Sequence, residues 1–137
     1  MDNAEILRQW LHRGKEEIES AEYLSTKHHP TPDETICYLC QQSAEKYFKG
    51  FIFSRGIEPE KTHDLEELLD ICKNYNEEFS SLLVKAIFLT KYAVLPRYPN
   101  DLNITTDDMK IAIRYAKDVQ EFVLKIIDDK FELDKCD

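Results

Sequence analysis

The chain has few of the residues that interrupt helices, with 3 glycines and 5 prolines among its 137 residues. It lacks any stretch close to the roughly 18 uninterrupted apolar residues that a membrane span needs. Its first residues do not show the basic and then apolar pattern of a signal peptide. Because 42% of the residues are hydrophobic and 33% are charged, we predict a folded, helix-rich protein that stays in the cytoplasm.

Cysteine is scarce, and the four thiols are scattered among helix-forming residues. A chain of this length can form its own hydrophobic core, so we expect free thiols rather than disulfides. Cys37 and Cys40 have CxxC spacing, but no second pair and no suitably spaced histidine completes a tetrahedral zinc site. We therefore predict no metal site and no cofactor.

Positive charge is in the minority, and the net charge is -9. Such a balance disfavours non-specific binding to nucleic acid, which depends on cations that displace counterions from phosphates. The exception is the window 79–100, which holds no Asp or Glu and contains Lys85, Lys91 and Arg97. This window is either a surface that faces an anion or a buried helix with solvated ends.

Apolar residues recur at helical spacing in five segments, and no window alternates long enough to indicate a strand. Prolines and a glycine separate these segments. The helices that we predict cover residues 3–26, 32–55, 65–75, 77–92 and 106–128. We predict an all-α fold, an antiparallel bundle of about five helices, in a single domain over 1–137 with its core at about 3–128 and a frayed C-terminal tail.

Capping signals mark several of these helix ends. Thr31, Pro32 and Glu34 read as a capping box, with the hydroxyl at the cap and proline at the first helical position. Gly56 is placed to end the second helix in the left-handed conformation. Asp64 is placed to cap the third helix.

The second predicted helix carries apolar residues on two sides. One side holds Ile36, Cys40, Ser43 and Tyr47, and Tyr38, Phe48 and Ile52 project toward the other. A helix that is apolar nearly all round is central to a bundle or covered by a partner. We therefore expect this helix at the centre, with part of it at a subunit interface, and homodimerisation as the simplest consequence.

Three polar residues of this helix, Gln41, Glu45 and Lys49, lie four positions apart among apolar neighbours. The structural interpretation is an intrahelical pair between Glu45 and Lys49, with side-chain amides bonded to a neighbouring helix. The functional interpretation is a polar pocket between helices that orients a ligand.

Three short motifs, taken together and in order, resemble the HEPN domain family. They are the run Gln-Gln-Ser-Ala-Glu-Lys-Tyr-Phe-Lys-Gly at 41–50, then His63-Asp64-Leu65, then Arg97-Tyr98-Pro99. The resemblance covers about residues 3–128. It implies a bundle of about five helices that is usually dimeric and is often paired with a small nucleotidyltransferase, either as a neighbouring protein or as a fused domain.

Other members of that family are metal-independent ribonucleases, whose signature is an arginine followed a few residues later by a histidine. Arg97 matches the first part, but no histidine follows His63 in the chain. The resemblance therefore implies a non-catalytic, homodimeric accessory protein of a small nucleotidyltransferase that contributes to a nucleotide site. One alternative is an endoribonuclease toxin of a toxin–antitoxin pair, in which Arg97 works with His63 or another unconventional partner. Another is a helical scaffold without a ligand.

The candidate site for a nucleotide, phosphate or RNA consists of Gln41, Glu45, Lys49, His63, Arg97 and Tyr98. We assign none of these a catalytic role. His63 can instead stabilise the turn before Asp64. Arg97 and Tyr98 can instead belong to an aromatic and proline turn that packs over the end of the bundle.

Overall fold

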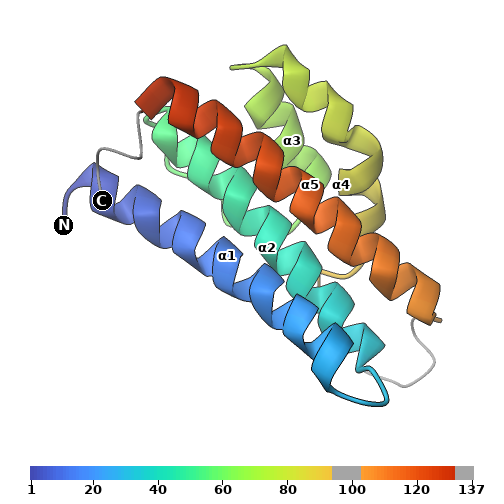
Figure 1. Ribbon diagram of the computed structural model, residues 1–137. Coiled ribbons are helices and arrows are strands. Elements are labelled where there is room, and N and C mark those ends of the chain that lie inside the picture. Colours follow the sequence, from blue (N-terminus) through green and yellow to red (C-terminus); the bar gives the residue numbers. More distant parts are fainter. Residues whose placement is uncertain (94–102, 132–137) are drawn as a thin grey trace.

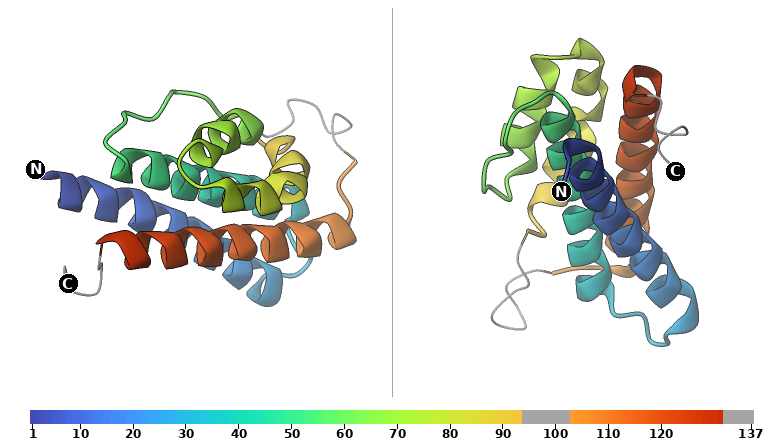
Figure 2. Two further views of the ribbon diagram at one scale, coloured as in Figure 1. Left: turned by 90° about the horizontal axis from the view of Figure 1, so that it is seen from above. Right: turned by 90° about the vertical axis from the view of Figure 1, so that its left-hand side faces the viewer.

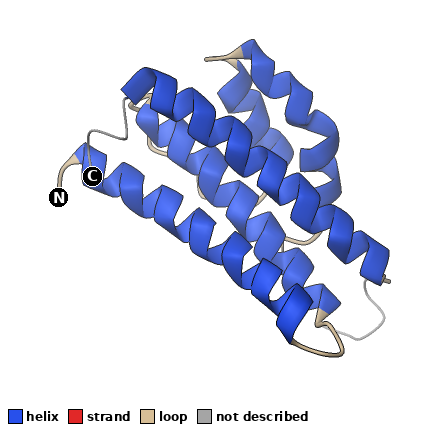
Figure 3. Ribbon diagram, in the orientation of Figure 1, coloured by secondary structure: helices blue, strands red, loops and turns tan. Residues whose placement is uncertain are grey.

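The computed structural model describes residues 1–93 and 103–131, with side chains as far as residue 127. Within these ranges every regular element is a helix (Figure 1, Figure 3). The elements are α1 (Asn3–Lys27), α2 (Asp33–Ser54), α3 (Leu65–Lys73), the 3-10 helix η1 (Glu77–Leu82), α4 (Leu83–Thr90) and α5 (Thr106–Phe131). The predicted all-α bundle is confirmed.

Helix α2 lies at the centre of the bundle. Helices α1 and α5 pack along one side of it, and α3 and α4 cover the other side (Figure 2). Helix α1 runs antiparallel to α2 and α5, whereas α2 and α5 run in the same direction (Figure 1). The parallel pair arises because α3, η1 and α4 intervene between them in the chain.

Most of both apolar faces of α2 is buried within this one chain, although Tyr38 is half-buried. Phe48 and Ile52, on the second face, are fully buried. The Cys72 thiol of α3 lies 3.8 Å from the backbone oxygen of Phe48, and the ring of Phe79 lies 4.6 Å from that of Phe51 between centroids. The predicted central position is confirmed. Phe48 of the second face is thus covered by the chain's own α3 and η1, and the expectation of a subunit interface on part of α2 stays a prediction.

Two of the predicted helix-end signals are confirmed. Gly56 has a φ of 84°, the left-handed region that glycine occupies without a steric cost. The Asp64 carboxylate caps α3 by accepting from the backbone N–H groups of Glu66 and Glu67 at 2.9 and 3.4 Å. Both signals depend only on neighbouring residues, which is why they can be predicted from the sequence.

The predicted capping box at the start of α2 is wrong. The cap position is Pro32, which has no side-chain cap hydrogen bond. The Thr31 hydroxyl instead donates to the Asp33 carboxylate at 2.6 Å, and the Asp33 carboxylate also accepts from Thr106 of α5 at 3.1 Å. The carboxylate thus draws the hydroxyl away from the backbone it was expected to cap.

The single helix predicted over 77–92 is divided into η1 and α4. Asn76 caps η1 by accepting from the backbone N–H of Glu78 at 2.9 Å, and the Ser81 hydroxyl donates to the Glu78 carbonyl oxygen at 2.9 Å. Side-chain bonds of this kind compete with the regular helical pattern. Phe79 is meanwhile held in the core against Phe51, so tertiary packing sets the tighter turn.

Three of the four cysteines, Cys37, Cys40 and Cys72, are free and buried, as predicted. Cys136 lies outside the described residues. Burial raises the pKa of the Cys37 thiol to about 12, so it is neutral at physiological pH. No helix in the described part of the chain is both long and apolar enough to cross a membrane.

Candidate functional site

Four of the six predicted site residues come together on one side of α2. Gln41, Glu45 and Lys49 follow one another at four-residue steps on the helix and are 0%, 2% and 7% exposed. His63 comes from the loop between α2 and α3, and its side chain is 61% exposed. The other two predicted residues, Arg97 and Tyr98, lie outside the described residues.

The carboxylate of Glu45 is the centre of this cluster. Its Oε2 accepts from Lys49 Nζ at 3.0 Å, which confirms the predicted intrahelical pair. Its Oε1 lies 2.9 Å from His63 Nδ1 and accepts from Gln41 Nε2 at 3.2 Å. The Gln41 amide also donates to the backbone oxygen of His63 at 3.0 Å, so it holds the loop as well as the carboxylate.

These donors keep Glu45 ionised. Burial raises the pKa of this carboxyl group, but the hydrogen bonds from His63, Lys49 and Gln41 together outweigh burial and hold the pKa below its usual range. An ionised carboxylate only accepts hydrogen bonds, so Nδ1 of His63 must carry a proton. In the neutral imidazole, Nε2 is then the unprotonated nitrogen on a side chain that is largely exposed.

The polar cluster extends across α2 to α1 through residues that the sequence analysis did not select. Gln42 Nε2 donates to Gln41 Oε1 at 2.6 Å, and Lys46 Nζ donates to Gln42 Oε1 at 3.3 Å. Lys46 also lies 3.4 Å from the Glu17 carboxylate of α1. The spacing of Gln42 and Lys46 could have identified that pair, whereas the contact with Glu17 joins residues 29 positions apart.

Glu17 behaves differently from Glu45. Burial raises the pKa of Glu17, and the nearby Lys46 and Arg13 offset this only in part. Its contacts with Lys46 are long, at 3.4 and 3.5 Å. One end of the polar cluster therefore holds a well-compensated carboxylate, and the other end holds a poorly compensated one.

The buried members of the cluster use their polar groups on one another. Among the described residues, no buried side-chain nitrogen or oxygen lacks a hydrogen-bond partner. This arrangement favours the structural interpretation of Gln41, Glu45 and Lys49, which position other groups rather than line an open pocket. His63 has the most exposed side chain of the cluster, whereas those of Lys46 and Glu17 are only partly exposed.

The described part of the acid-free window, residues 79–93, is partly buried and partly an exposed apolar surface. Lys85 pairs with Asp118 of α5 at 3.0 Å, so it does not face solvent as an isolated cation. Leu83, Val84 and Ile87 of α4 are 39%, 68% and 48% exposed. We refer to these three residues as the α4 apolar face.

Comparison with known proteins gives one family and two similar folds. The model of the HEPN domain family matches residues 7–127. The crystal structure of ST0689, an archaeal HEPN homologue, superposes with a TM-score of 0.67 at 25% identity, over 88% of this chain and 97% of that one. The crystal structure of TT1696 from Thermus thermophilus has a TM-score of 0.68 at 24% identity, over 91% and 98%. No curated protein matches the chain.

Proposed function

This chain belongs to the HEPN domain family, and on that premise we propose that it is a non-catalytic, homodimeric protein that binds a small nucleotidyltransferase. We propose further that the His63 side of the molecule contacts a nucleotide at the interface with that enzyme. The observation that carries this proposal is the geometry of His63, whose ring is fixed by Glu45 and is largely exposed. An oriented imidazole can donate to or accept from a phosphate or a base.

The proposed absence of catalysis has a chemical reason. Cleavage of RNA through attack by a 2′-hydroxyl requires groups that transfer protons near neutral pH. The chain has no histidine after His63, so the partner that Arg97 has in the family's ribonucleases is missing. Lys49 is paired with Glu45 and is nearly buried, so it is a poor substitute.

Co-expression with a small nucleotidyltransferase from the same genome tests the proposal. We expect the two proteins to purify together, and we expect the complex to bind ATP in calorimetry about tenfold more tightly than a His63→Ala complex, because one hydrogen bond to phosphate is lost. His12→Ala is the matched control, since His12 is an exposed histidine on α1. Binding of neither the enzyme nor ATP at tens of micromolar would contradict the proposal and favour a scaffold without a ligand.

The pairing of Glu45 with His63 also favours one alternative, an endoribonuclease toxin in which Arg97 works with His63. A carboxylate bonded to Nδ1 orients an imidazole so that Nε2 can act as a base. Purified protein incubated with single-stranded RNA separates the two functions. Cleavage that is lost in both Arg97→Ala and His63→Ala would show that the protein is an enzyme, whereas intact RNA rules out this alternative.

A further inference from the structure

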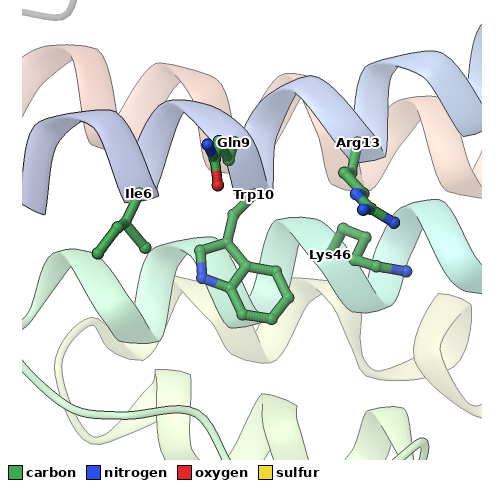
Figure 4. Close-up of a pocket in the computed structure, with 5 residues that line it drawn as sticks. All are labelled: Ile6, Gln9, Trp10, Arg13 and Lys46. Carbon is green, nitrogen blue, oxygen red and sulfur yellow. The ribbon is translucent and has the colours of Figure 1, made fainter. Parts of the chain in front are cut away.

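A groove of about 340 Å³ lies on the surface where α1 packs on α2, and its accessible lining is mainly apolar. The residues that line it are Ile6, Gln9, Trp10 and Arg13 of α1 and Lys46 of α2. Figure 4 shows the indole of Trp10 lying over α2, with Ile6 on one side of it and the charged ends of Arg13 and Lys46 on the other. We refer to Ile6 and Trp10 as the apolar floor of the groove and to Arg13 and Lys46 as its cationic end.

The packing of α1 on α2 fixes the apolar floor and leaves it accessible. Leu7 and Leu11 of α1 are buried, whereas Trp10, on the same helix, is half-buried. A Cβ added to Gly50 would lie 3.3 Å from the Cβ of Trp10, so the two backbones approach closely at this point. Because the helix that carries the indole is already fixed in the folded chain, a ligand would meet a preformed surface, and binding would lose little free energy in ordering it.

The cationic end carries charge that its neighbours compensate only in part. Within the described ranges, Arg13 is exposed and forms no ion pair with a carboxylate. In the same part of the chain, Lys46 makes only long contacts, at 3.4 and 3.5 Å to the Glu17 carboxylate and at 3.3 Å to Gln42. Residues 6–15 contain no Asp or Glu, although the net charge of the chain is -9. This end of the groove therefore favours an anionic group.

The composition of the groove is that of a protein interface. Tryptophan and arginine are enriched at the positions that dominate binding between proteins, and an exposed apolar surface with a polar rim is typical of such contacts. The net charge of -9 disfavours a polyanion as the ligand. A ligand that is partly apolar and carries isolated carboxylates matches both the floor and the cationic end.

We propose that this groove docks an acidic segment of a partner protein, with a large apolar side chain of the segment on Trp10 and a neighbouring carboxylate bound by Arg13 and Lys46. A guanidinium group binds a carboxylate through two parallel hydrogen bonds, which gives the contact a defined direction. The groove is separate from His63, and the proposal does not depend on the function proposed above.

Selection from a library of phage-displayed random peptides tests the proposal with the full chain. We expect the wild-type protein to enrich peptides in which a large apolar residue lies next to Asp or Glu. We expect Arg13→Glu not to enrich them, because the carboxylate of the peptide would meet a like charge. Lys15→Glu is the matched control, since Lys15 is an exposed cation two positions along α1 that does not line the groove. This control should enrich the same peptides as the wild type.

A synthetic peptide of the selected sequence then measures the contact at the cationic end by calorimetry. We expect Arg13→Ala to weaken binding about tenfold through the loss of a charged hydrogen bond, and Lys15→Ala to leave it unchanged. Replacing the acidic residue of the peptide by its amide should weaken wild-type binding by a similar factor and should have little further effect on Arg13→Ala, because the two changes remove the same interaction. Trp10 is the only tryptophan in the chain, so its emission should shift to shorter wavelength as the peptide displaces water from the indole.

The proposal is overturned if no peptide is enriched, if the enriched peptides lack an acidic residue, or if Arg13→Glu and Lys15→Glu select the same peptides. Independent effects of Arg13→Ala and of the amide in the peptide would also overturn it. His63→Ala should bind the peptide as the wild type does, so failure of the function proposed above leaves this test intact.

Two other occupants of the groove would replace the partner protein. Tighter peptide binding by the full-length double variant Glu132→Gln and Asp134→Asn would assign the groove to the chain's own segment 132–137. A wild-type dimer that dissociates in Arg13→Glu but not in Lys15→Glu, measured by ultracentrifugation, would assign it to a second copy. Either result would overturn the proposal of a partner protein.

Discussion

Two glutamates in the same polar cluster show how the number of donors decides the state of a buried acid. Glu45 is bonded by Lys49, His63 and Gln41 at 3.2 Å or less, and its pKa is lowered despite burial. Within the part of the chain that the structure describes, the Glu17 carboxylate accepts hydrogen bonds only from Lys46, at 3.4 Å or more, and burial raises its pKa. The two acids should therefore affect stability in opposite ways as the pH changes.

For Glu45, the folded-state pKa lies below the unfolded value of about 4.3. Its charge therefore contributes stability that is present above that pH and is lost as the pH falls through the folded pKa. Glu45→Gln leaves Lys49 nearly buried without a counter-charge, so we expect a loss of about 3 kcal/mol at pH 7. Urea unfolding at pH 7 and at lower pH should show the difference from wild type shrinking with acidity.

Glu17→Gln is the matched control, and the effect of its charge on stability has the opposite sign. The folded-state pKa of Glu17 is raised, so its ionisation lowers stability as the pH rises through that pKa. We expect the free energy of unfolding of this variant at pH 7 to lie within about 1 kcal/mol of the wild-type value, or to exceed it. Equal losses in both variants, with the same dependence on pH, would show that the donors around Glu45 do not matter.

At the scale of elements, the approach of α1 to α2 depends on small residues at the contact. A Cβ added to Gly14 would lie 2.7 Å from Cε2 of Tyr47. Tyr47 is fully buried, and its hydroxyl accepts from Gln120 of α5 at 2.9 Å, so the ring cannot move aside freely. The Gly14 carbonyl also accepts from the Ser43 hydroxyl at 2.7 Å, which fixes the register of the two helices.

Gly14→Ala should therefore destabilise the protein even though alanine is the better helix former. The gain in helix propensity is about 1 kcal/mol, whereas forcing a methyl group into a filled core costs about 1 to 3 kcal/mol. We expect a net loss of about 1 to 2 kcal/mol in urea unfolding, as the balance of these two effects.

Gly50→Ala provides the comparison, because its added Cβ would come no closer than 3.2 Å to Cδ2 of Leu11. The end of the Leu11 side chain can yield by a few tenths of an ångström, and the second contact, with the Cβ of Trp10, is 3.3 Å and therefore much less severe than the 2.7 Å contact at Gly14. We therefore expect a smaller change, within about 1 kcal/mol. If Gly14→Ala is as stable as wild type, the Tyr47 ring is not the constraint that we describe.

At the scale of the whole molecule, the homodimer that we propose needs a contact other than the second face of α2. That face is filled by α3 and η1 of the same chain. The α4 apolar face is the contact that we propose for a second copy. Its three exposed side chains lie next to one another on one helix, and the acid-free window around it brings no carboxylates of two copies together in an otherwise acidic chain.

The double variant Val84→Glu and Ile87→Glu tests this contact. Charges introduced into an apolar interface must lose their hydration without gaining a partner. We therefore expect the dissociation constant of the dimer to rise tenfold or more. Analytical ultracentrifugation measures it. Tyr23→Glu, at an exposed aromatic residue of α1, is the control. A monomeric wild type, or a double variant that remains dimeric, would contradict the proposal.

The predictions from sequence succeeded or failed according to how far apart the interacting residues lie. The cap at Asp64, the turn at Gly56 and the pair between Glu45 and Lys49 involve residues within four positions. The failures were the cap at Thr31 and the undivided helix over 77–92. At Thr31, the Asp33 carboxylate, which also bonds Thr106 of α5, prevailed over the local capping preference. In the segment 77–92, the packing of Phe79 against Phe51 prevailed over the local preference for one continuous helix.

By itself, the sequence determined that this protein is an all-α bundle with a central, doubly apolar helix, and it carried the motifs of its family. These properties follow from the spacing of apolar residues along a helix and from interactions between residues close in the chain, both of which can be read directly from the sequence. Only the tertiary structure decided that His63 meets Glu45, that Glu17 meets Lys46, and that α3 rather than a partner covers Phe48. Those contacts join residues 18 to 29 positions apart, and they depend on how the helices pack against one another, which residue spacing does not specify.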